Sequence, residues 1–426
     1  MRTLPHLIVF SHLRWEFVFQ RPQHLLSRLA RHFHVVVVEE PMHTSGPARL
    51  ERTTPCEGVE VLRAHTPVEA GGFHDDQLSA LQPMISGYLA DNAIDDYLVW
   101  FYTPMALPLL ADLAPRAIVY DCMDELSAFK NAPRQMRQRE TALLKSADLV
   151  VTGGPRLYEA KRDANPNVLC LPSAVDAEHY SARRATADIA AMARAGGLQG
   201  CIAAPRLGFF GVIDERIDLD LVARLADADP DWQIVMVGPV VKIDEAALPQ
   251  RPNLHYLGQQ PYALLPQIVA GWSVCLMPFA LNESTEFISP TKTLEYMAAG
   301  KPVVSTPIHD VKAMFGDIVA IAPDAELFVA ACRQALSESP AQEVERQQRM
   351  AERVREHSWD VAAETIRRSL DGVLAAPRTS APALVAMAPG GSPGRSTARS
   401  VAVTNTKAAE HPDDDPAVLR KVASAH

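Results

Sequence analysis

The chain has 426 residues, a hydrophobic fraction of 48% and a formal net charge of −10. A chain of this length normally needs more than one hydrophobic core, so we expect two or three domains. The negative net charge argues against nucleic acid as the main partner, but it is compatible with a local basic patch that contacts a membrane. There is no run of about eighteen apolar residues and no secretory signal pattern, so we expect a cytoplasmic protein, with peripheral attachment to the inner face of the membrane as an open variant.

The first half of the chain alternates short apolar runs with helical patterns. Val35–Val38 is a continuous β-branched run, typical of a parallel strand buried on both faces. The alternation predicts a doubly wound parallel sheet, in which ligands bind beyond the carboxyl ends of the strands. The predicted strands are His6–Phe10, Val35–Val38, Val59–Leu62, Tyr97–Phe101, Ala117–Tyr120, Leu149–Thr152 and Val168–Leu171, and the predicted helices are Gln20–Arg31, Asp76–Asn92, Met105–Leu113, Gln135–Ser146 and Pro155–Asp163.

Two groups of polar residues follow strands of this half. His12, Arg14 and Trp15 come after the first strand, where an aromatic ring beside polar groups is a common sugar platform, although Trp15 is equally compatible with packed core. Asp121 and Asp124 come after a later strand, and clustered carboxylates suit acid–base chemistry or the binding of sugar hydroxyls. The plainer alternative is that Asp124 caps a helix. We expect all five side chains to face a cleft, with Asp121 as a catalytic candidate.

The polar, alanine-rich stretch Glu178–Gly200 marks a junction, after which strands and helices alternate again. The sequence therefore predicts a second α/β domain of similar size that faces the first across a cleft. Its predicted strands are Leu207–Phe210, Gln233–Val237, His255–Leu257, Val274–Met277, Val303–Val304 and Ile318–Ile321, and its predicted helices are Leu219–Ala228, Tyr262–Ala270 and Ala325–Ser337.

Gly211 ends the first strand of this second half, and Arg216 follows in the next loop. A glycine at such a position lets the backbone approach a ligand closely. An arginine near a helix start is a candidate phosphate clamp, and simple solvation is the alternative.

The stretch from residue 289 to residue 300 is predicted to be a sharply bounded helix. Ser289 suits the N-cap, Pro290 suits the first turn, and Gly300 suits the C-terminal cap. A helix N-terminus offers unpaired N–H groups and a partial positive charge, which is a place to hold a diphosphate. The alternative is a surface helix with ordinary capping residues.

Side chains around this helix start strengthen the anion-site hypothesis. Thr291 and Lys292 add a hydroxyl and an ammonium, and Ser289 adds a second hydroxyl. Glu295 lies one turn after Thr291 on the same face, so its carboxylate can accept hydrogen bonds from a ribose. Glu283 and Glu286 precede the helix and are candidates either for a sugar contact or for a solvent-exposed loop.

The chain ends in two helical patterns and a tail. Ala341–His357 is a charged helix, and a last amphipathic helix follows Ser358 to about Leu374. Beyond Ala376 the sequence is rich in Pro, Ala, Ser, Gly and Thr, which predicts a disordered tail. We divide the chain into a first domain (1–180), a second domain (181–357), a helix that crosses back to the first domain (358–375) and the tail (376–426).

The sequence lacks the motifs that are typical of several classes of cofactor-binding protein. No G-x-G-x-x-G follows the first strand and no Walker A sequence is present, which argues against nicotinamide, flavin and P-loop chemistry. Six cysteines are scattered without metal-ligand spacing. We expect no metal and no resident cofactor.

Three motifs resemble the GT-B retaining glycosyltransferases of group 1, or family 4. They are Ser289-Pro-Thr-Lys-Thr-Leu-Glu-Tyr-Met-Ala-Ala-Gly-Lys-Pro-Val-Val304, Leu171-Pro-Ser-Ala-Val-Asp176 and Ser358-Trp-Asp360. The stretch from Ser11 to Leu26 is similar to bacterial teichuronic-acid and exopolysaccharide glycosyltransferases. The resemblance implies two facing Rossmann-like domains, a nucleotide-sugar donor in the second, a glycolipid or glycan acceptor in the first, and a last helix that crosses back.

The resemblance also assigns roles residue by residue. Glu295 falls on the family's ribose-binding glutamate, and Thr291 and Lys292 fall on its phosphate-cradling helix start. The first glutamate of the family's E-x7-E pattern falls on Phe287, so the carboxylate for the donor sugar is expected from Glu283 or Glu286. The family's arginine and lysine after the first donor-domain strand fall near Val212 and Ile217, so Arg216 alone is expected to supply that positive charge. The family's histidine at the end of an acceptor-domain strand is replaced around Asp121.

These observations lead to one function and two alternatives. We expect a retaining, metal-independent glycosyltransferase that moves a sugar from a nucleoside-diphosphate-sugar to a lipid-linked or polysaccharide acceptor. Its expected catalytic residues are Asp121, Arg216, Glu286 and Lys292, its expected donor-binding residues are Gly211, Arg216, Ser289, Thr291, Lys292 and Glu295, and its expected acceptor-side residues are His12, Arg14, Trp15 and Asp124. The alternatives are a nucleotide-sugar 2-epimerase on the same fold and a non-catalytic GT-B binding subunit.

Overall fold

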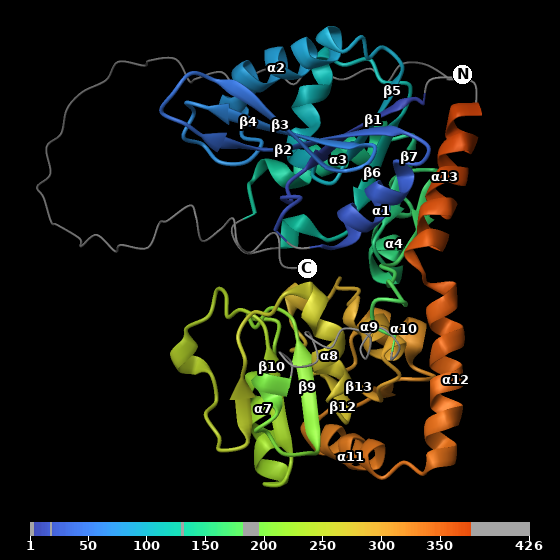
Figure 1. Cartoon of the computed structure of the whole chain (residues 1–426). Helices are drawn as coiled ribbons and strands as arrows, with labels where there is room; N and C mark the ends of the chain where they lie inside the picture. The colour runs from blue at the N-terminus through green and yellow to red at the C-terminus, as the bar shows by residue number, and fades with distance from the viewer. Residues whose placement is uncertain (1–3, 18, 129–131, 182–195, 376–426) are drawn as a thin grey trace, which may run out of the picture.

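The computed structural model describes residues 4–17, 19–128, 132–181 and 196–375. These residues form two α/β bodies, one above the other in Figure 1, each built on its own mainly parallel sheet. The predicted α/β class is confirmed. The predicted disordered tail, 376–426, lies outside the described residues. Among the residues that the structure describes, no helix has the length and apolar character needed to cross a membrane.

The first body contains an eight-stranded sheet. Its central strands are continuous buried apolar runs, because helices cover both faces of a parallel sheet. The strand order is β3-β4-β2-β1-β5-β6-β7-β8, and every neighbouring pair is parallel except β3 and β4. The strands are β1 (His6–Ser11), β2 (His34–His43), β3 (Arg49–Cys56), β4 (Val59–Thr66), β5 (Tyr97–Phe101), β6 (Ile118–Cys122), β7 (Leu149–Thr152) and β8 (Val168–Cys170).

Two features of the first body differ from the prediction. Strand β3 was not predicted, because this antiparallel edge strand is mostly polar and carries no hydrophobic pattern. The segment Pro104–Asp112 forms 3-10 turns instead of an α-helix, since Pro108 within it cannot donate a backbone hydrogen bond. The helices of this body are α1 (Arg21–Leu29), α2 (Leu78–Asp91), α3 (Gln135–Ser146) and α4 (Pro155–Lys161), with 3-10 turns at Asp75–Gln77 and Leu126–Ala128.

The second body contains a six-stranded sheet whose neighbouring strands are all parallel, in the order β11-β10-β9-β12-β13-β14. Its strands are β9 (Arg206–Phe210), β10 (Gln233–Val237), β11 (Leu254–Tyr256), β12 (Val274–Met277), β13 (Val303–Ser305) and β14 (Ala320–Ile321). Its helices are α7 (Leu219–Ala228), α8 (Leu265–Ala270), α9 (Lys292–Ala298), α10 (His309–Phe315), α11 (Ala325–Leu336) and α12 (Pro340–Glu356), with 3-10 turns at Glu245–Ala247, Tyr262–Leu264 and Glu283–Thr285. Helix α10 was not predicted.

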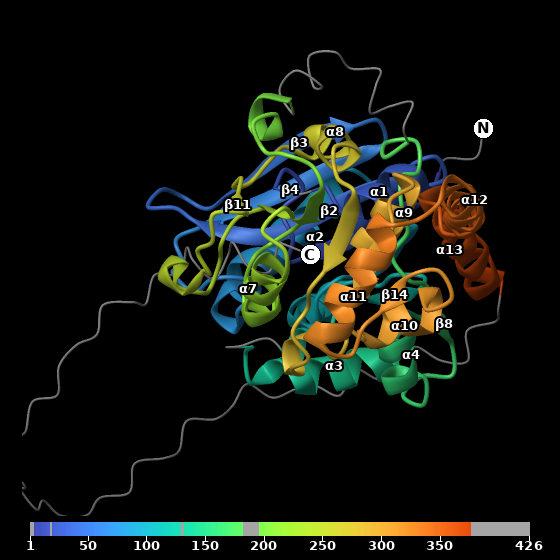
Figure 2. The same cartoon turned by 90° about the horizontal axis from the view of Figure 1, so that it is seen from below.

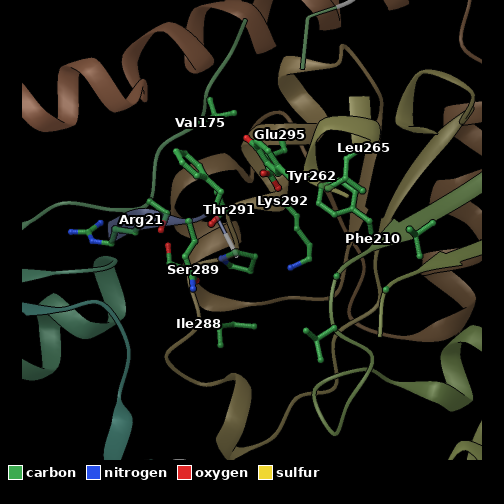
Figure 3. A pocket seen from close by; sticks show the side chains of 18 of the residues that line it. Arg21, Val175, Phe210, Tyr262, Leu265, Ile288, Ser289, Thr291, Lys292 and Glu295 are labelled. Atoms are coloured by element: carbon green, nitrogen blue, oxygen red, sulfur yellow. The ribbon is translucent and has the colours of Figure 1, made fainter. Parts of the chain in front are cut away.

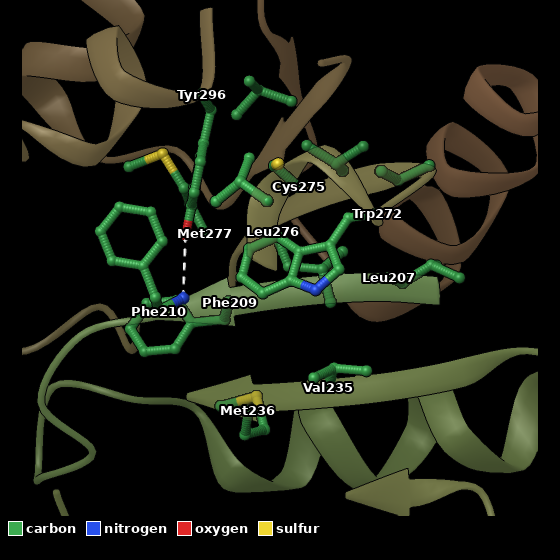
Figure 4. Close-up of a cluster of buried hydrophobic side chains, with 14 of the residues drawn as sticks. Leu207, Phe209, Phe210, Val235, Met236, Trp272, Cys275, Leu276, Met277 and Tyr296 are labelled. Atoms are coloured by element: carbon green, nitrogen blue, oxygen red, sulfur yellow. Dashed lines mark hydrogen bonds between the residues drawn. The ribbon is translucent and has the colours of Figure 1, made fainter. Parts of the chain in front are cut away.

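The core of the second body holds α9 against the end of β9. The backbone N–H of Phe210 donates a hydrogen bond of 3.0 Å to the buried hydroxyl of Tyr296 (Figure 4). Trp272 packs beside them on Gly208, where an added Cβ would lie 2.0 Å from the indole ring. These contacts fix the start of α9 relative to the loop after β9.

The last two helices connect the bodies. Helix α12 lies along the second body, and α13 (Trp359–Ala375) continues along the first (Figures 1 and 2). The ring of Trp359 stacks on His24 of α1, with centroids 4.8 Å apart. Val175 pairs with Ser358 where the chain passes between the bodies. These observations support our division of the chain at residues 180 and 357, which stays a prediction.

Candidate active site

A cavity of about 390 Å³ lies between the two bodies. The first body contributes the loop before α1 and the loop after β6, and the second contributes the loops after β9 and β10 and the start of α9. The cavity therefore lies beyond the carboxyl ends of strands, where a doubly wound sheet binds ligands. Figure 3 shows Lys292 and Glu295 extending from α9, with Arg21 approaching from the first body.

The loop after β9 passes directly beneath a lysine. Gly211 has a φ of +140°, a conformation that favours glycine. A Cβ at this position would lie 2.2 Å from Cε of Lys292. A side chain at residue 211 would therefore displace Lys292, so the predicted pairing of a close-approach glycine with this lysine has a direct steric basis.

The ammonium of Lys292 lines the cavity, and none of the residues that the structure describes forms an ion pair with it. Its Nζ lies 5.8 Å from the centroid of the Phe209 ring, and no hydrogen bond or ion pair of Nζ occurs within the described residues. Burial lowers the pKa of Lys292 to about 8, and Arg216 acts in the same direction, whereas Glu295 and Asp214 oppose the shift. A desolvated cation without a partner favours the binding of an anion.

Arg216 is held in one orientation by Asp214. Its Nε lies 2.9 Å from Oδ1 of Asp214, its Nη2 lies 2.6 Å from Oδ2, and both residues are buried. This fork leaves Arg216 on the cavity wall as a fixed cation. Asp124 lines the same cavity from the first body, where burial raises its pKa to about 6 and Arg216 and Arg21 oppose the rise.

Glu295 lines the cavity on the same helix as Lys292. Burial raises the pKa of its carboxyl group to about 7, and Lys292 and the Tyr180 hydroxyl oppose that rise. Its charge therefore changes near neutral pH.

Ser289 and Thr291 also line the cavity, but the helix begins later than predicted. Helix α9 starts at Lys292 with Thr291 at the N-cap, so the expected N-cap role of Ser289 is wrong. The hydroxyl oxygen of Ser289 would lie 2.9 Å from a Cβ on Gly154, because Ser289 faces the first body. Gly300 follows the helix with a φ of +68°, as predicted for the C-terminal end.

Asp121 does not face the cavity, which corrects the prediction that it meets substrate. Its carboxylate is fully buried and accepts from Nε of Arg21 at 3.2 and 3.1 Å. Arg21 also donates from Nη1 to the carbonyl of Leu171 at 2.8 Å, and it is Arg21 that lines the cavity. Asp121 lies inside β6, which runs two residues further than the predicted strand, and its charge is neutralised within the first body.

His12, Arg14 and Trp15 likewise lie outside the cavity lining. The fully buried carboxylate of Glu39 accepts from Nη1 of Arg14 at 3.1 Å and from the backbone N–H of Trp15 at 2.7 Å. The Trp15 ring packs against the core of the first body, and burial lowers the pKa of His12 to about 4. The buried carboxylate of Glu39, within β2, therefore holds this loop toward the sheet, and the acceptor-side role of these three residues stays a prediction.

The acidic residues before α9 do not reach the cavity either. Glu286 accepts a hydrogen bond of 2.6 Å from Nη2 of Arg156 in the first body, and Glu283 is exposed. The ring of Phe287 lies 5.5 Å from Cζ of Arg156 and packs against the first body's core. This loop therefore contacts the first body and offers the cavity no carboxylate.

The aromatic residues on one side of the cavity were missed by sequence reasoning. Phe19 stacks on Tyr262 with centroids 6.2 Å apart, and it meets the ring of His24 edge-on at 4.6 Å. All three line the cavity, together with Phe17. The available signal was the pair of phenylalanines, Phe17 and Phe19, two positions apart in the loop before α1.

Within the described ranges, no three or more His, Cys, Asp or Glu side chains are grouped so that they could hold a metal ion.

Comparisons with known proteins add to this geometry. Residues 204–338 match the family described as glycosyl transferases group 1, a stretch that contains the whole six-stranded sheet. The chain is 25% identical over 279 residues to TuaH of Bacillus subtilis (strain 168), a protein named as a teichuronic acid biosynthesis glycosyltransferase; the match covers 61% of this chain and 68% of TuaH.

Solved structures resemble the whole arrangement of the two bodies. The sucrose-phosphate synthase of Thermosynechococcus elongatus has a TM-score of 0.66 at 15% identity, covering 88% of this chain and 100% of that one. Anabaena HepE, in complex with UDP and glucose, has a TM-score of 0.62 at 14% identity and covers 86% of this chain and 100% of its own. An Escherichia coli structure titled trehalose-6-phosphate, bound with UDP-2-fluoro glucose, has a TM-score of 0.61 at 14% identity, with coverages of 87% and 99%.

At these identities the solved structures show the fold, which is the GT-B arrangement predicted from the sequence. The family match lies on the body that supplies Gly211, Arg216, Lys292 and Glu295 to the cavity. The chain is therefore a glycosyltransferase of the GT-B type.

Proposed function

We propose that this glycosyltransferase moves a sugar, with retention of configuration, from a nucleoside-diphosphate-sugar to a lipid-linked or polysaccharide acceptor. The observation that carries the proposal is a pair of cations on the walls of one cavity: Arg216, which Asp214 holds in place, and Lys292, which lies over the close-approach loop at Gly211. A diphosphate is the anion that such a pair suits, because its oxygens can accept from both cations at once.

The donor would lie against the second body. Lys292 and Arg216 would hold the diphosphate, with the hydroxyls of Ser289 and Thr291 beside it, since all four line the cavity. Glu295 would accept hydrogen bonds from the ribose hydroxyls. The two similar structures whose titles include UDP or a UDP-sugar support this class of donor.

The acceptor would lie against the first body. Asp124 is the predicted acceptor-side residue that lines the cavity, and its carboxylate can accept a hydrogen bond from an acceptor hydroxyl other than the attacking one. The similarity to TuaH supports an acceptor used in envelope or exopolysaccharide synthesis. Peripheral contact with a membrane belongs to the same proposal, because a lipid-linked acceptor resides there.

The chemistry would depend on stabilising the leaving diphosphate. As the bond from the anomeric carbon to the diphosphate oxygen breaks, negative charge develops on that oxygen. Lys292 and Arg216 are preorganised next to that charge, and the departing oxygen would accept the proton of the attacking hydroxyl on the same face of the sugar. We propose that these side chains act without a metal ion or a resident cofactor.

A thermal-shift screen tests the donor class. Glucose linked to UDP, GDP, ADP and dTDP is added in turn, and the matching nucleotide-sugar is expected to raise Tm because it binds only the folded state. No shift with any of them would contradict the proposal. Incubation with the donor alone distinguishes a transferase from the epimerase alternative, because an epimerised donor formed without acceptor would contradict transfer. The anomeric configuration of the transfer product, measured by NMR, tests retention.

Replacing Glu295 by glutamine is expected to change stability and donor binding in opposite directions. Because folding raises the pKa of Glu295 from 4.5 to about 7, the folded state binds more protons than the unfolded state between these two values, and wild-type stability falls as pH rises through that range. The variant lacks this loss, so its Tm advantage should grow between about pH 5 and about pH 8. Loss of a charged acceptor should weaken nucleotide-sugar binding about tenfold at the higher pH.

The matched control for this variant is Glu326→Gln, which changes an exposed carboxyl group on α11 away from the cavity. Its Tm difference from wild type should be independent of pH, and its nucleotide-sugar affinity should match the wild type. Equal effects of the two substitutions would contradict the role assigned to Glu295.

A further inference from the structure

The start of α4 in the first body is capped by a residue of the second body. The backbone N–H of Arg156 donates a hydrogen bond of 2.9 Å to Oδ1 of Asp310, which belongs to α10 and is 1% exposed. The residue at the N-cap of α4 is Gly154, which has no side chain to do this. A cap usually comes from the helix's own N-cap residue, so this helix depends on the other body for it.

Gly154 is required here for space. Its φ of −178° is extended backbone that any residue adopts. A Cβ on Gly154, however, would lie 2.0 Å from Oδ2 of Asp310 and 2.8 Å from Cβ of Ser289. The two bodies therefore touch at this point at van der Waals distance, and the glycine allows it.

The same place is held by the loop that leads into α9. Glu286 accepts from Nη2 of Arg156 at 2.6 Å, and the Phe287 ring lies under the same guanidinium and packs against the first body's core. Two residues after Phe287, Ser289 faces Gly154 and lines the cavity. The contacts of Asp310, Glu286 and Phe287 with α4 are called here the clasp. Glu286 and Phe287 come shortly before the proposed donor-binding residues in the chain, and Asp310 follows them on α10.

We infer that the clasp holds the two bodies closed over the cavity, and that Asp310 is a positioning residue for transfer because Asp310 and Ser289 meet the first body at the same residue, Gly154. Asp310 lies outside the cavity lining, so it acts through this contact between the bodies and not by touching substrate. The inference rests on the proposed function for its effect on turnover, whereas its effect on the separation of the bodies is independent of any substrate.

The test compares Asp310→Ala with Asp310→Asn and with a capping control. Asp310→Ala removes the acceptor for Arg156 and is expected to lower kcat/KM about tenfold or more, since misplacement of a binding loop is costly. Asp310→Asn keeps an oxygen for that N–H and should stay within about threefold of wild type. Asp324→Ala removes the N-cap of α11, where Asp324 accepts from Leu327 N–H at 2.9 Å, and should lower Tm without changing kcat/KM.

A second readout needs no substrate. Small-angle scattering of the ligand-free protein should give a larger radius of gyration for Asp310→Ala than for the wild type and Asp324→Ala. Gly154→Ala should behave as Asp310→Ala does, and combining the two should add little further, because both break the same contact. Kinetics are measured with whichever of UDP-, GDP-, ADP- or dTDP-glucose stabilises the wild type.

An unchanged radius of gyration in Asp310→Ala, or a kcat/KM equal to that of Asp324→Ala, would overturn the inference. If the wild type turns over none of these sugars, the proposed function fails, while the scattering comparison still decides whether the clasp holds the bodies together.

Discussion

Replacing Lys292 by methionine is expected to lower kcat about a hundredfold or more, because a preorganised charge stabiliser at a developing anion typically contributes that much. Methionine keeps a long apolar stem over Gly211 and removes only the ammonium. Since Nζ has no counter-ion among the described residues, removing its charge should leave Tm unchanged or raise it. Initial rates at saturating donor, together with Tm, measure both effects.

The matched control for this variant is Lys312→Met, which removes the same charge from an exposed position on α10. Its kcat and Tm should match the wild type. A kcat of Lys292→Met within about threefold of wild type would show that the ammonium does not stabilise the leaving group. A Tm clearly below that of the wild type would instead show that Lys292 has a structural role.

Most of the fold could be predicted from the sequence, because buried parallel strands consist of continuous apolar residues. Val35–Val38 and Val274–Met277 are such runs, and both are strands in the structure. Strand β3 and helix α10 could not be predicted in this way. The first is a polar edge strand paired on one side, and the second is a helix of 7 residues whose buried apolar side chains are only Val311 and Phe315.

The donor side of the site was predictable for a similar reason. Gly211, Thr291, Lys292 and Glu295 belong to one strand end and one helix start, and Tyr296 fixes these two elements to each other. Each residue type there follows from a local requirement: close approach, anion binding or a polar acceptor.

Apart from Asp124, the first-body side was not predictable, because its side chains are placed by partners far away in the sequence. Asp121 is neutralised by Arg21, a hundred positions earlier, and Arg14 and Trp15 are drawn to Glu39. The sequence around a carboxylate or an aromatic residue near a strand end does not reveal such a distant partner. Phe287 and Glu286 show the same limit, since their shared partner Arg156 belongs to the other body.

Replacing Arg216 by methionine should lower both turnover and stability. Turnover should fall about a hundredfold, because the second cation at the diphosphate is lost. Stability should fall by about 3–5 kcal/mol, because Asp214, whose side chain is 2% exposed, would keep a buried charge without its fork of hydrogen bonds. Urea unfolding and initial rates, measured on the same preparations, give the two quantities.

A double variant separates these effects of Arg216. Asp214→Asn combined with Arg216→Met removes the stranded charge, so most of the lost stability should return while turnover stays low. Recovery of turnover together with stability would show that Arg216 serves only to neutralise Asp214. Recovery of stability alone would place the guanidinium in the reaction, because the fold would then be intact and the cavity would lack only the charge that faces the leaving diphosphate.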